Sequence, residues 1–299
     1  MDTVIRAERL SKRFGATAAL DGLDLEVRAG EVFGFVGPNG AGKTTTIRIL
    51  LDLLRPTSGT VEVLGMDPRA DGVAVRSRIG YLPGDLNLPP RLTGRQFLGD
   101  HAAVRGLDLR VAHAALAERL AVDLDRPMGE LSLGNRRKVG VVAAFAHRPA
   151  LLVLDEPTGG LDPLVQQEFR SMAKEAAADG ATVFLSSHVL DEVQHLADRV
   201  AVLRAGRVVA EDRVDALLGR MRRTVVLQFA APVPADRFTA VEGVVSAAAV
   251  GASVAVVVAG PLGPVVAAAV AEGLVDLRAE EPDLEDAFLG LYRGDAGHG

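Results

Sequence analysis

The sequence contains no cysteine and no tryptophan among its 299 residues. Disulfide bonds and thiolate metal sites are therefore excluded. Aromatic residues make up only 4% of the chain, so we ask of an aromatic side chain near a motif whether it has a specific role. The N-terminus has no basic stretch followed by an apolar run, and we expect no signal peptide.

The chain carries a formal net charge of −6, with 24% charged and 48% hydrophobic residues. These shares are ordinary for a globular protein, and the acidic balance argues against a protein that binds nucleic acid over its whole surface. Residues 244–271 form a long uncharged stretch that contains three glycines and two prolines. A membrane helix is one interpretation; the glycines and prolines favour the other, two short strands followed by a helix.

The stretch from Gly37 to Thr45 matches the phosphate-binding pattern G-x-x-x-x-G-K-[ST]. An apolar run predicts a strand before it, and apolar positions at helical spacing predict a helix after it. Backbone N–H groups at such a helix start bind phosphate, the lysine reaches the β- and γ-phosphates, and the first threonine holds Mg²⁺. The alternative is a glycine-rich turn that binds nothing. The candidate ATP-binding residues here are Gly37, Asn39, Gly40, Gly42, Lys43, Thr44 and Thr45.

Two carboxylates follow an apolar run at residues 151–154, which predicts a strand buried on both faces. Adjacent carboxylates are costly there unless a cation or a catalytic task requires them. Asp155 can complete an Mg²⁺ site with Thr44, and Glu156 can orient a water for attack on the γ-phosphate. His188 follows another apolar run and is a candidate γ-phosphate contact, although a lone histidine is more often a structural cap.

The roles of two side chains, the aromatic Phe14 and the hydroxyl-bearing Ser132, leave alternatives open. Phe14 is predicted either to stack on a purine base near the phosphate loop or to be a plain core side chain. Ser132, in the stretch Leu131–Asn135, offers a hydroxyl at the start of a predicted helix. We favour a helix N-cap there over a second anion-binding site.

The order of predicted elements indicates an α/β domain followed by a smaller unit. Residues 93–120 are helical by pattern. The composition changes near Arg220–Arg223, so we place the boundary there, with a first domain at residues 1–220 and a small α+β domain at 221–299. The predicted order of the second domain is strand, helix, strand, strand, helix, strand, helix, and its last helix covers Leu284–Leu289.

In this order the motifs resemble those of the ATP-binding subunit of an ABC transporter, in the class that powers bacterial drug, antibiotic and lipid exporters. The resemblance covers residues 3 to about 218 through motifs, and the tail more loosely through residues 281–288. It implies an α/β fold, a P-loop NTPase of the ABC ATPase type with a helical signature subdomain at about residues 85–147. It also implies hydrolysis of ATP with Mg²⁺ as cofactor.

The resemblance also implies a role for each matching residue. The catalytic residues are Lys43, Glu156 as the base and His188 as the γ-phosphate switch. Phe14 corresponds to the adenine-stacking aromatic, and Thr44 and Asp155 to the metal ligands. The family signature corresponds to Ser132, Gly134 and Asn135, and Asp162 falls in the loop that crosses the dimer.

Two places depart from the family pattern. In the signature, Leu133 stands where glycine is usual and Asn135 where glutamine is usual. After the strand that ends at Leu82, Gly84 replaces a glutamine that helps to complete the metal and water shell. Either a water or the neighbouring Asp85 takes over that task, unless Gly84 merely permits a tight turn and Asp85 is solvated.

The resemblance implies that ATP closes a head-to-tail homodimer or heterodimer and that hydrolysis reopens it. The motion would pass to a separately encoded membrane permease, which places the chain in the cytoplasm at the inner face of the cell membrane, with no nucleic-acid partner. The alternative class is a soluble ABC ATPase that acts on nucleic acid or ribosomes. Those relatives carry long coiled-coil insertions or two ATPase domains, and neither is visible here. A P-loop kinase or GTPase accounts for neither the signature nor His188.

Overall fold

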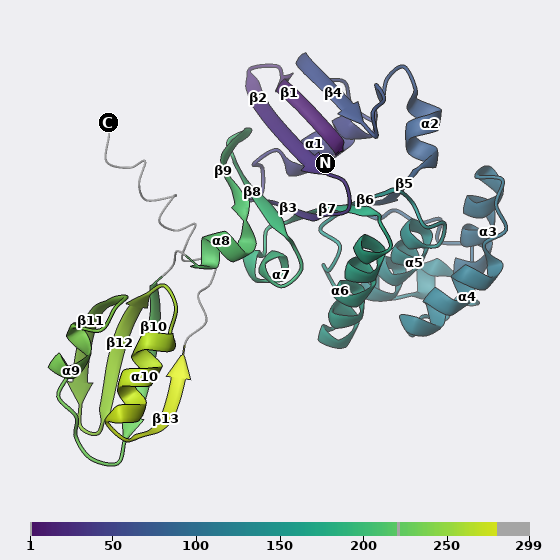
Figure 1. Cartoon of the computed structure of the whole chain (residues 1–299). Helices are drawn as coiled ribbons and strands as arrows, with labels where there is room; N and C mark the ends of the chain where they lie inside the picture. The colour runs from purple at the N-terminus through teal and green to yellow at the C-terminus, as the bar shows by residue number, and fades with distance from the viewer. Residues whose placement is uncertain (1, 220–221, 280–299) are drawn as a thin grey trace. The chain divides into compact units, whose positions relative to one another are not determined.

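The computed structural model describes residues 2–219 and 222–279, and the chain falls into two compact units, residues 1–211 and 212–299. The first unit contains the phosphate loop (Figure 1). The division lies within strand β9 (Arg207–Arg213). The boundary predicted from composition falls partly on Arg220 and Met221, which lie outside the described residues.

A six-stranded sheet forms the centre of the first unit, in the order β5-β6-β7-β3-β8-β9. Three central strands are buried at every residue, as expected for parallel strands covered on both faces: β3 (Val32–Val36), β6 (Leu151–Asp155) and β7 (Thr182–Ser187). The strands β5 (Ile79–Leu82) and β8 (Arg199–Arg204) flank them. Parallel pairing brings the carboxyl ends of β3, β6 and β7 to one edge, where ligands bind in open α/β sheets.

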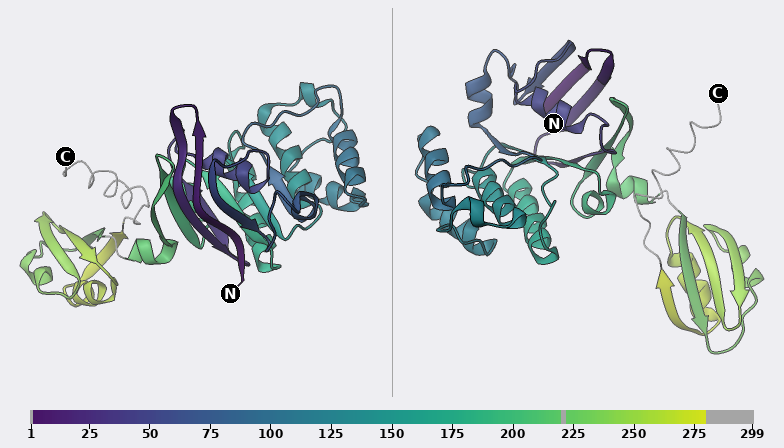
Figure 2. Two further views of the ribbon diagram at one scale, coloured as in Figure 1. Left: turned by 90° about the horizontal axis from the view of Figure 1, so that it is seen from above. Right: turned by 180° about the vertical axis from the view of Figure 1, so that it is seen from behind.

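A three-stranded antiparallel sheet, in the order β2-β1-β4, covers helix α1 (Figures 1 and 2). Its strands are β1 (Thr3–Phe14), β2 (Thr17–Arg28) and β4 (Ser58–Val63). Helix α1 (Lys43–Leu50) lies between this sheet and the central one. Ile47 of α1 packs in one core with Leu20 of β2 and Phe35 of β3, so the two sheets hold the helix that follows the phosphate loop.

The stretch predicted to be helical at residues 93–120 contains α3 (Gly94–Val104) and α4 (Arg110–Arg119). Thr93 begins α3 with a capping box, in which its hydroxyl accepts from the N–H of Gln96 and its own N–H donates to the Gln96 side chain. The longer helices α5 (Leu133–Phe145) and α6 (Pro163–Ala178) follow in the chain, after the short 3₁₀ turn Met128–Glu130.

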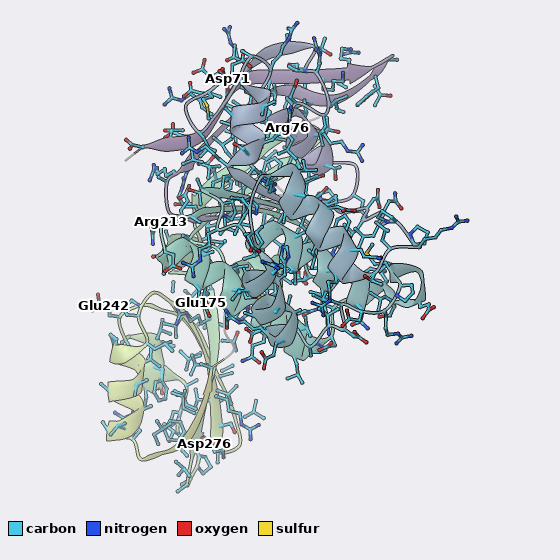
Figure 3. The ribbon with its side chains drawn as sticks, turned by 90° about the vertical axis from the view of Figure 1, so that its right-hand side faces the viewer. Asp71, Arg76, Glu175, Arg213, Glu242 and Asp276 are labelled. Carbon is cyan, nitrogen blue, oxygen red and sulfur yellow. The ribbon has the colours of Figure 1, made fainter. Side chains whose placement is uncertain are left out.

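Two short helices of the first unit have no signal in the sequence pattern. They are α2 (Gly72–Ser77) and α7 (Leu190–Gln194), and neither is long enough to show helical periodicity. Arg76 of α2, labelled in Figure 3, donates to the carbonyl oxygen of Leu51 at 3.3 Å and so fixes α2 to the end of α1.

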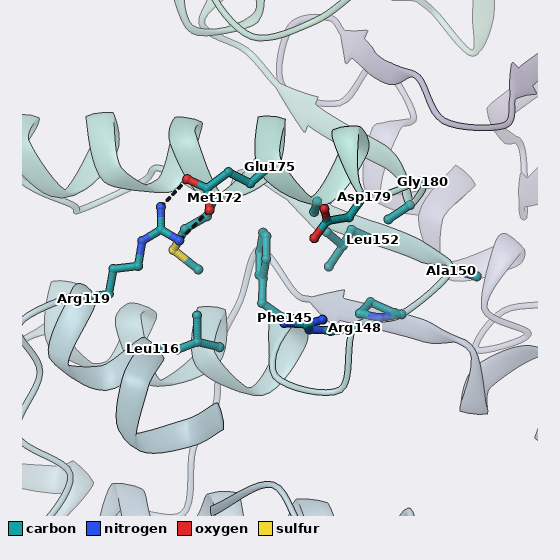
Figure 4. A pocket seen from close by; sticks show the side chains of 13 residues that line it. Leu116, Arg119, Phe145, Arg148, Ala150, Leu152, Met172, Glu175, Asp179 and Gly180 are labelled. Atoms are coloured by element: carbon teal, nitrogen blue, oxygen red, sulfur yellow. Dashed lines mark hydrogen bonds and ion pairs between the residues drawn. The ribbon is translucent and has the colours of Figure 1, made fainter. Parts of the chain in front are cut away.

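Arg119 ties α4 to α6. Its two Nη atoms donate to the two carboxylate oxygens of Glu175, each at 2.6 Å (Figure 4). Its Nε donates to Glu168. Such a bidentate pair fixes orientation as well as distance. The pair borders a pocket of about 560 Å³ whose lining includes residues 148–150 before β6 and residues 179–181 before β7, at the amino ends of these strands.

Three histidines gather where these helices meet β5: His101 on α3, His113 on α4, and His147 in the loop before β6. The rings of His101 and His147 lie 6.1 Å apart, and Arg105 donates to Nε2 of His101 at 3.3 Å. Burial lowers the pKa of all three histidines. That of His101 falls to about 4, because the positive charge of Arg105 and the neighbouring histidines add to the effect of burial. These rings therefore stay neutral at neutral pH.

We expect the unfolding temperature to fall as the pH is lowered from about 6.5 to about 4. The unfolded chain binds a proton at His101 near pH 6.5, but the folded chain does so only near pH 4, so stability present above pH 6.5 is lost across this window. His101→Phe keeps a ring beside Phe97 and should flatten the dependence. Thermal denaturation at fixed ionic strength measures the slope, with His195→Asn at an exposed position as the control. Equal slopes for the parent and His101→Phe would contradict this assignment.

The second unit has a core of its own. Its antiparallel sheet has the order β11-β12-β10-β13, and two helices contribute to a single core with it: α9 (Asp236–Thr239) and α10 (Gly263–Ala271). The strands are β10 (Arg222–Phe229), β11 (Val244–Val250), β12 (Ser253–Ala259) and β13 (Leu274–Ala279), preceded in the chain by α8 (Val214–Gly219). This is the predicted order of elements. The last predicted helix, Leu284–Leu289, lies outside the described residues.

The uncharged stretch at residues 244–271 forms β11, β12 and α10, so the interpretation as two strands and a helix is correct. The turn between the strands contains Gly251 at φ +62°. Within residues 2–219 and 222–279, none of the helices has the length and apolar character that a membrane crossing requires.

Candidate active site

The phosphate loop joins β3 to α1, and two of its glycines leave no room for a side chain. A Cβ at Gly37 would lie 2.3 Å from the carbonyl oxygen of Leu203, and one at Gly42 would lie 2.7 Å from that of Ala19. Gly42 also has φ +114°, in the region that favours glycine. The spacing of the two glycines is therefore required by close packing of the loop backbone against β8 and β2.

The three predicted catalytic side chains meet at the carboxyl edge of the sheet. Lys43 is only 5% exposed, and its Nζ donates to the carbonyl oxygen of Gly37 at 2.6 Å and lies 3.4 Å from Oε1 of Glu156. The second carboxylate oxygen, Oε2, lies 2.7 Å from Nδ1 of His188. Glu156 thus connects the lysine of the loop to the histidine after β7. The N-cap of α7 is Val189, so His188 does not cap that helix.

The backbone of Glu156 adopts an unusual conformation, with φ +50°. A residue with a side chain holds such a conformation at a cost of about 1–3 kcal/mol, and only where its surroundings impose it. The N–H of Glu156 donates to the carbonyl oxygen of Ser186 at 3.1 Å, and its carbonyl accepts from Arg137. The direction of the candidate catalytic carboxylate is therefore set by restrained backbone.

The two predicted metal ligands lie in contact. The Thr44 hydroxyl donates to Oδ2 of Asp155 at 2.9 Å, and the Ser186 hydroxyl donates to Oδ1 of the same carboxylate at 2.5 Å. A hydroxyl and a carboxylate are hard oxygen ligands that suit Mg²⁺. In the described part of the chain, no three His, Cys, Asp or Glu side chains are grouped to enclose an ion. That fits Mg²⁺ bound by one or two protein oxygens together with substrate phosphates.

The loop after β5 completes a pocket of about 340 Å³ with the phosphate loop, Asp155 and Glu156. Gly84 and Asp85 both line it, together with Tyr81 and Arg48. Burial, and then the charge of Asp155, raise the pKa of the Tyr81 hydroxyl, and Asp85 adds to that rise. A Cβ at Gly84 would lie 3.2 Å from Oδ2 of Asp155, so a larger residue at position 84 would crowd the metal ligand.

The signature residues lie elsewhere in the first unit. The Ser132 hydroxyl accepts from the N–H of Asn135 at 3.2 Å and is the N-cap of α5, which is the interpretation favoured from the sequence. A Cβ at Gly134 would lie 2.6 Å from the carbonyl oxygen of Gly160, so this glycine permits close contact with the next loop. Asp162 is the N-cap of α6. The lining of the 340 Å³ pocket includes none of the four residues Ser132, Gly134, Asn135 and Asp162.

Phe14 is 51% exposed at the end of β1, and the Lys12 ammonium lies 5.1 Å from its ring centroid. The plain core alternative for Phe14 is therefore wrong. The phenyl ring does not line the 340 Å³ pocket, whereas Ala19, five residues further along the same hairpin, does.

Two buried polar residues at the site were not found from the sequence. Ser186 is fully buried and bonds Asp155; its only signal was its place in the Ser-Ser-His stretch that ends β7. Arg137 is 5% exposed and donates to the carbonyl oxygens of Gly84 and Glu156. The only feature of the sequence that could have indicated this residue is its charge, since it is the first residue of the run that is buried in α5.

Comparison with known sequences gives one consistent result. The ABC transporter family model matches residues 20–159. A bacitracin transport ATP-binding protein of Bacillus licheniformis is 36% identical over 231 residues, which cover 76% of this chain and 76% of the relative. A daunorubicin resistance ATP-binding protein of Streptomyces coeruleorubidus is 43% identical over 221 residues, which cover 72% of this chain and 70% of the relative.

Solved structures share the fold. An ATP-binding subunit of an ABC transporter is similar with a TM-score of 0.66 at 30% identity, covering 72% of this chain and 92% of that one. A dimeric bacterial ABC transporter cassette is similar with a TM-score of 0.64, covering 70% of this chain and 98% of that one. At 23% identity, this second likeness concerns the fold alone.

Proposed function

Since the chain belongs to the ABC transporter family, as an ATP-binding subunit that hydrolyses ATP, we propose that it powers export of a substrate through a separate membrane permease. One observation carries the assignment of its site: Lys43, Asp155 and Glu156, from distant parts of the sequence, line one pocket at the carboxyl edge of the sheet. These side chains can bind phosphate, hold a cation and activate water, which is what hydrolysis of ATP requires.

In this proposal, the first step is a change of partner at Lys43. Its ammonium contacts the carbonyl oxygen of Gly37 and the Glu156 carboxylate, and the phosphate oxygens of ATP would replace these contacts. Glu156 is then free to accept a proton from the attacking water, while His188 holds its other oxygen. Thr44 and Asp155 would hold Mg²⁺, which neutralises charge on the phosphates.

We propose that the signature residues serve a second copy of the chain or a closely related subunit. Ser132 and Leu133 are exposed, and the pocket that holds the phosphate loop does not include them. Asp162, also exposed, begins α6 after the loop that Gly134 touches. A head-to-tail dimer would bring these residues to the nucleotide of the partner. The second unit, of which no described residue is among the lining residues of the pocket, would then support dimer or partner contacts.

The names of the relatives support an export function. One is described as a bacitracin transport protein, another as a daunorubicin resistance protein, and a third, from Burkholderia lata, as a Nod factor export protein at 36% identity over 231 residues, covering 76% of each chain. We propose that this chain acts in the same class, at the cytoplasmic face of the membrane, on a cargo that its permease selects.

Reconstitution tests this function. The full chain would be purified with a candidate membrane permease from a neighbouring reading frame and placed in proteoliposomes, with Lys43→Ala as the inactive control. We expect the membrane protein to stimulate ATP hydrolysis and to retain the chain on the vesicles. A rate of ATP hydrolysis that does not change with the membrane protein but increases when ribosomes or nucleic acid are added would favour the soluble ABC ATPase class instead.

Asp85→Ala is expected to raise the Mg²⁺ concentration needed for half-maximal ATPase activity, on the order of tenfold. Asp85 lines the same pocket as Asp155, and its neighbour at position 84 offers no side chain, so Asp85 can supply a carboxylate that supports a bound cation. Binding of ATP without metal should be nearly unchanged, as measured with a fluorescent ATP analogue in EDTA. Asp108→Ala, at an exposed carboxylate on another loop, is the control. Superimposable Mg²⁺ curves for Asp85→Ala and the parent would remove Asp85 from the site.

A further inference from the structure

Arg137 is a buried cation beside the candidate active site. It lies on α5, five residues after Ser132, and is only 5% exposed. Within residues 2–219 and 222–279, its recorded bonds all go to backbone oxygens. Burying a guanidinium is costly, and both these bonds and the nearby negative charges of Asp155, Glu156 and Asp85 offset that cost.

Its guanidinium joins two loops of the active site. The five hydrogen bonds end on the carbonyl oxygens of Pro83 (3.5 Å) and Gly84 (2.7 Å) after β5, and of Asp155 (3.1 Å), Glu156 and Pro157 (3.3 Å) after β6. Five donors in a rigid planar fork can reach acceptors on both sides at once. The three donors of a lysine ammonium are arranged around a single atom and cannot reproduce this pattern.

We propose that Arg137 is a positioning residue for ATP hydrolysis, which fixes the backbone of Glu156 and so the direction of its carboxylate. Three bonds hold Glu156 at φ +50°: its N–H donates to Ser186, and its carbonyl accepts from Arg137 and, at 3.3 Å, from the N–H of Gly159. Loss of the bond from Arg137 would leave this carbonyl with the longer bond from Gly159, and the peptide could then rotate toward ordinary φ values and turn the carboxylate away from Lys43 and His188. This inference rests on the proposed role of Glu156 in activating water.

The position of Arg137 also gives the signature helix a direct connection to the catalytic loop. Ser132 begins α5, and Arg137 lies on the second turn of the same helix. A displacement of α5 by contact with a second subunit would therefore pull on the Glu156 carbonyl and, through Gly84, on the loop after β5. Arg137 thus couples occupation of the signature to alignment of the base.

The test uses the full chain with Arg137→Ala, and with Arg95→Ala, an exposed arginine paired with Asp125, as the control. We expect kcat of Arg137→Ala to fall about 10²-fold, because a small misplacement of a catalytic group has effects of that size. KM for ATP should change by less than about threefold, since the groups that bind phosphate are untouched. Arg137→Lys keeps the charge but not the planar fork, and should remain slow.

Chemical rescue separates positioning from general stability. Arg137 borders a groove of about 680 Å³ that Gly84 and Glu156 also line, so a small guanidinium ion can enter the space left by Arg137→Ala. Guanidinium at a low, non-denaturing concentration should restore part of kcat, and an equal concentration of ammonium should not. Equal losses of kcat and ATP affinity without rescue, or a fully active Arg137→Lys, would overturn the proposal. If Arg137→Ala does not fold, Arg137→Lys and Arg137→Gln carry the same kcat and KM comparison.

A double variant distinguishes this inference from the proposed role of Glu156. In the Glu156→Gln background, Arg137→Ala should cause no further loss, since a residue that acts through Glu156 has nothing left to position. A Glu156→Gln enzyme with the parent rate would show that the proposed base is wrong. A slow Glu156→Gln enzyme in which Arg137→Ala still costs its full factor would keep the base and reject the role of Arg137.

Discussion

Glu156→Gln is expected to lower the rate of ATP hydrolysis by about 10²–10⁴-fold, the usual cost of losing a positioned base. Glutamine has the size of glutamate and can still bond His188 and Lys43, which lie 2.7 Å and 3.4 Å from the two carboxylate oxygens. It cannot take a proton from water. MgATP should therefore bind but persist, and the variant should accumulate as a dimer on gel filtration with MgATP, while the parent returns to its nucleotide-free state.

The control for this result is Glu192→Gln. Glu192 is a neighbouring carboxylate that accepts from the hydroxyls of Thr158 and Ser187, and a glutamine oxygen can accept both bonds. This variant should keep the rate of the parent. Near-normal turnover by Glu156→Gln, with no dimer in MgATP, would show that another group orients the water.

Gly42→Ala is expected to reduce ATP affinity by about 10²-fold or more. The new methyl group would lie 2.7 Å from the carbonyl oxygen of Ala19, and φ +114° is unfavourable for alanine in any surroundings. Relief of both requires the phosphate loop to change shape, and a penalty of about 3 kcal/mol corresponds to about 10²-fold in affinity. Titration with a fluorescent ATP analogue, together with circular dichroism to confirm folding, measures the change.

Gly180→Ala separates the effect of the positive φ from the effect of the close contact with Ala19. Gly180 has φ +95°, close to that of Gly42, but no atom lies within 4 Å of the position its Cβ would occupy. It precedes β7 at the amino end of the strand, away from the phosphate loop. Gly180→Ala should cost some stability and leave ATP affinity unchanged. If Gly42→Ala bound ATP as tightly as Gly180→Ala does, the close packing of the loop against β2 would have no role in binding.

The sequence could predict those parts of the site that depend on local pattern. The phosphate loop, the apolar run of β6 and the acids after it each carry their own signal, and the carboxyl ends of parallel strands meet at one edge. That rule alone places Asp155 beside Thr44, where the structure finds them 2.9 Å apart. The capping role of Ser132 was equally local, because it depends on the next three residues only.

The rest depends on contacts between distant segments. The local sequence does not indicate φ +50° at Glu156, because two of the residues that hold this conformation, Ser186 and Arg137, lie 30 and 19 residues away. Arg137 looked like one more charge in an arginine-rich stretch, and its five acceptors come from two loops whose approach no pattern predicts. The choice between an exposed and a core position for Phe14 could not be made from the sequence either, since its exposure depends on how the β1–β2 hairpin lies over the core.

The order of strands in the central sheet has a consequence for biosynthesis. β3 lies between β7 and β8, so both of its neighbours come much later in the chain. About 146 residues separate the end of β3 from the start of β7, and at roughly 5–20 residues per second β3 waits roughly 7–30 s for its first neighbour during translation. Through that interval its apolar residues have no neighbouring strand to pair with, and for most of it, until Asp155 is made, Thr44 has no carboxylate partner. ATP in the cell can therefore stabilise the growing chain only late in its synthesis, and until then the nascent protein depends on protection from other sources.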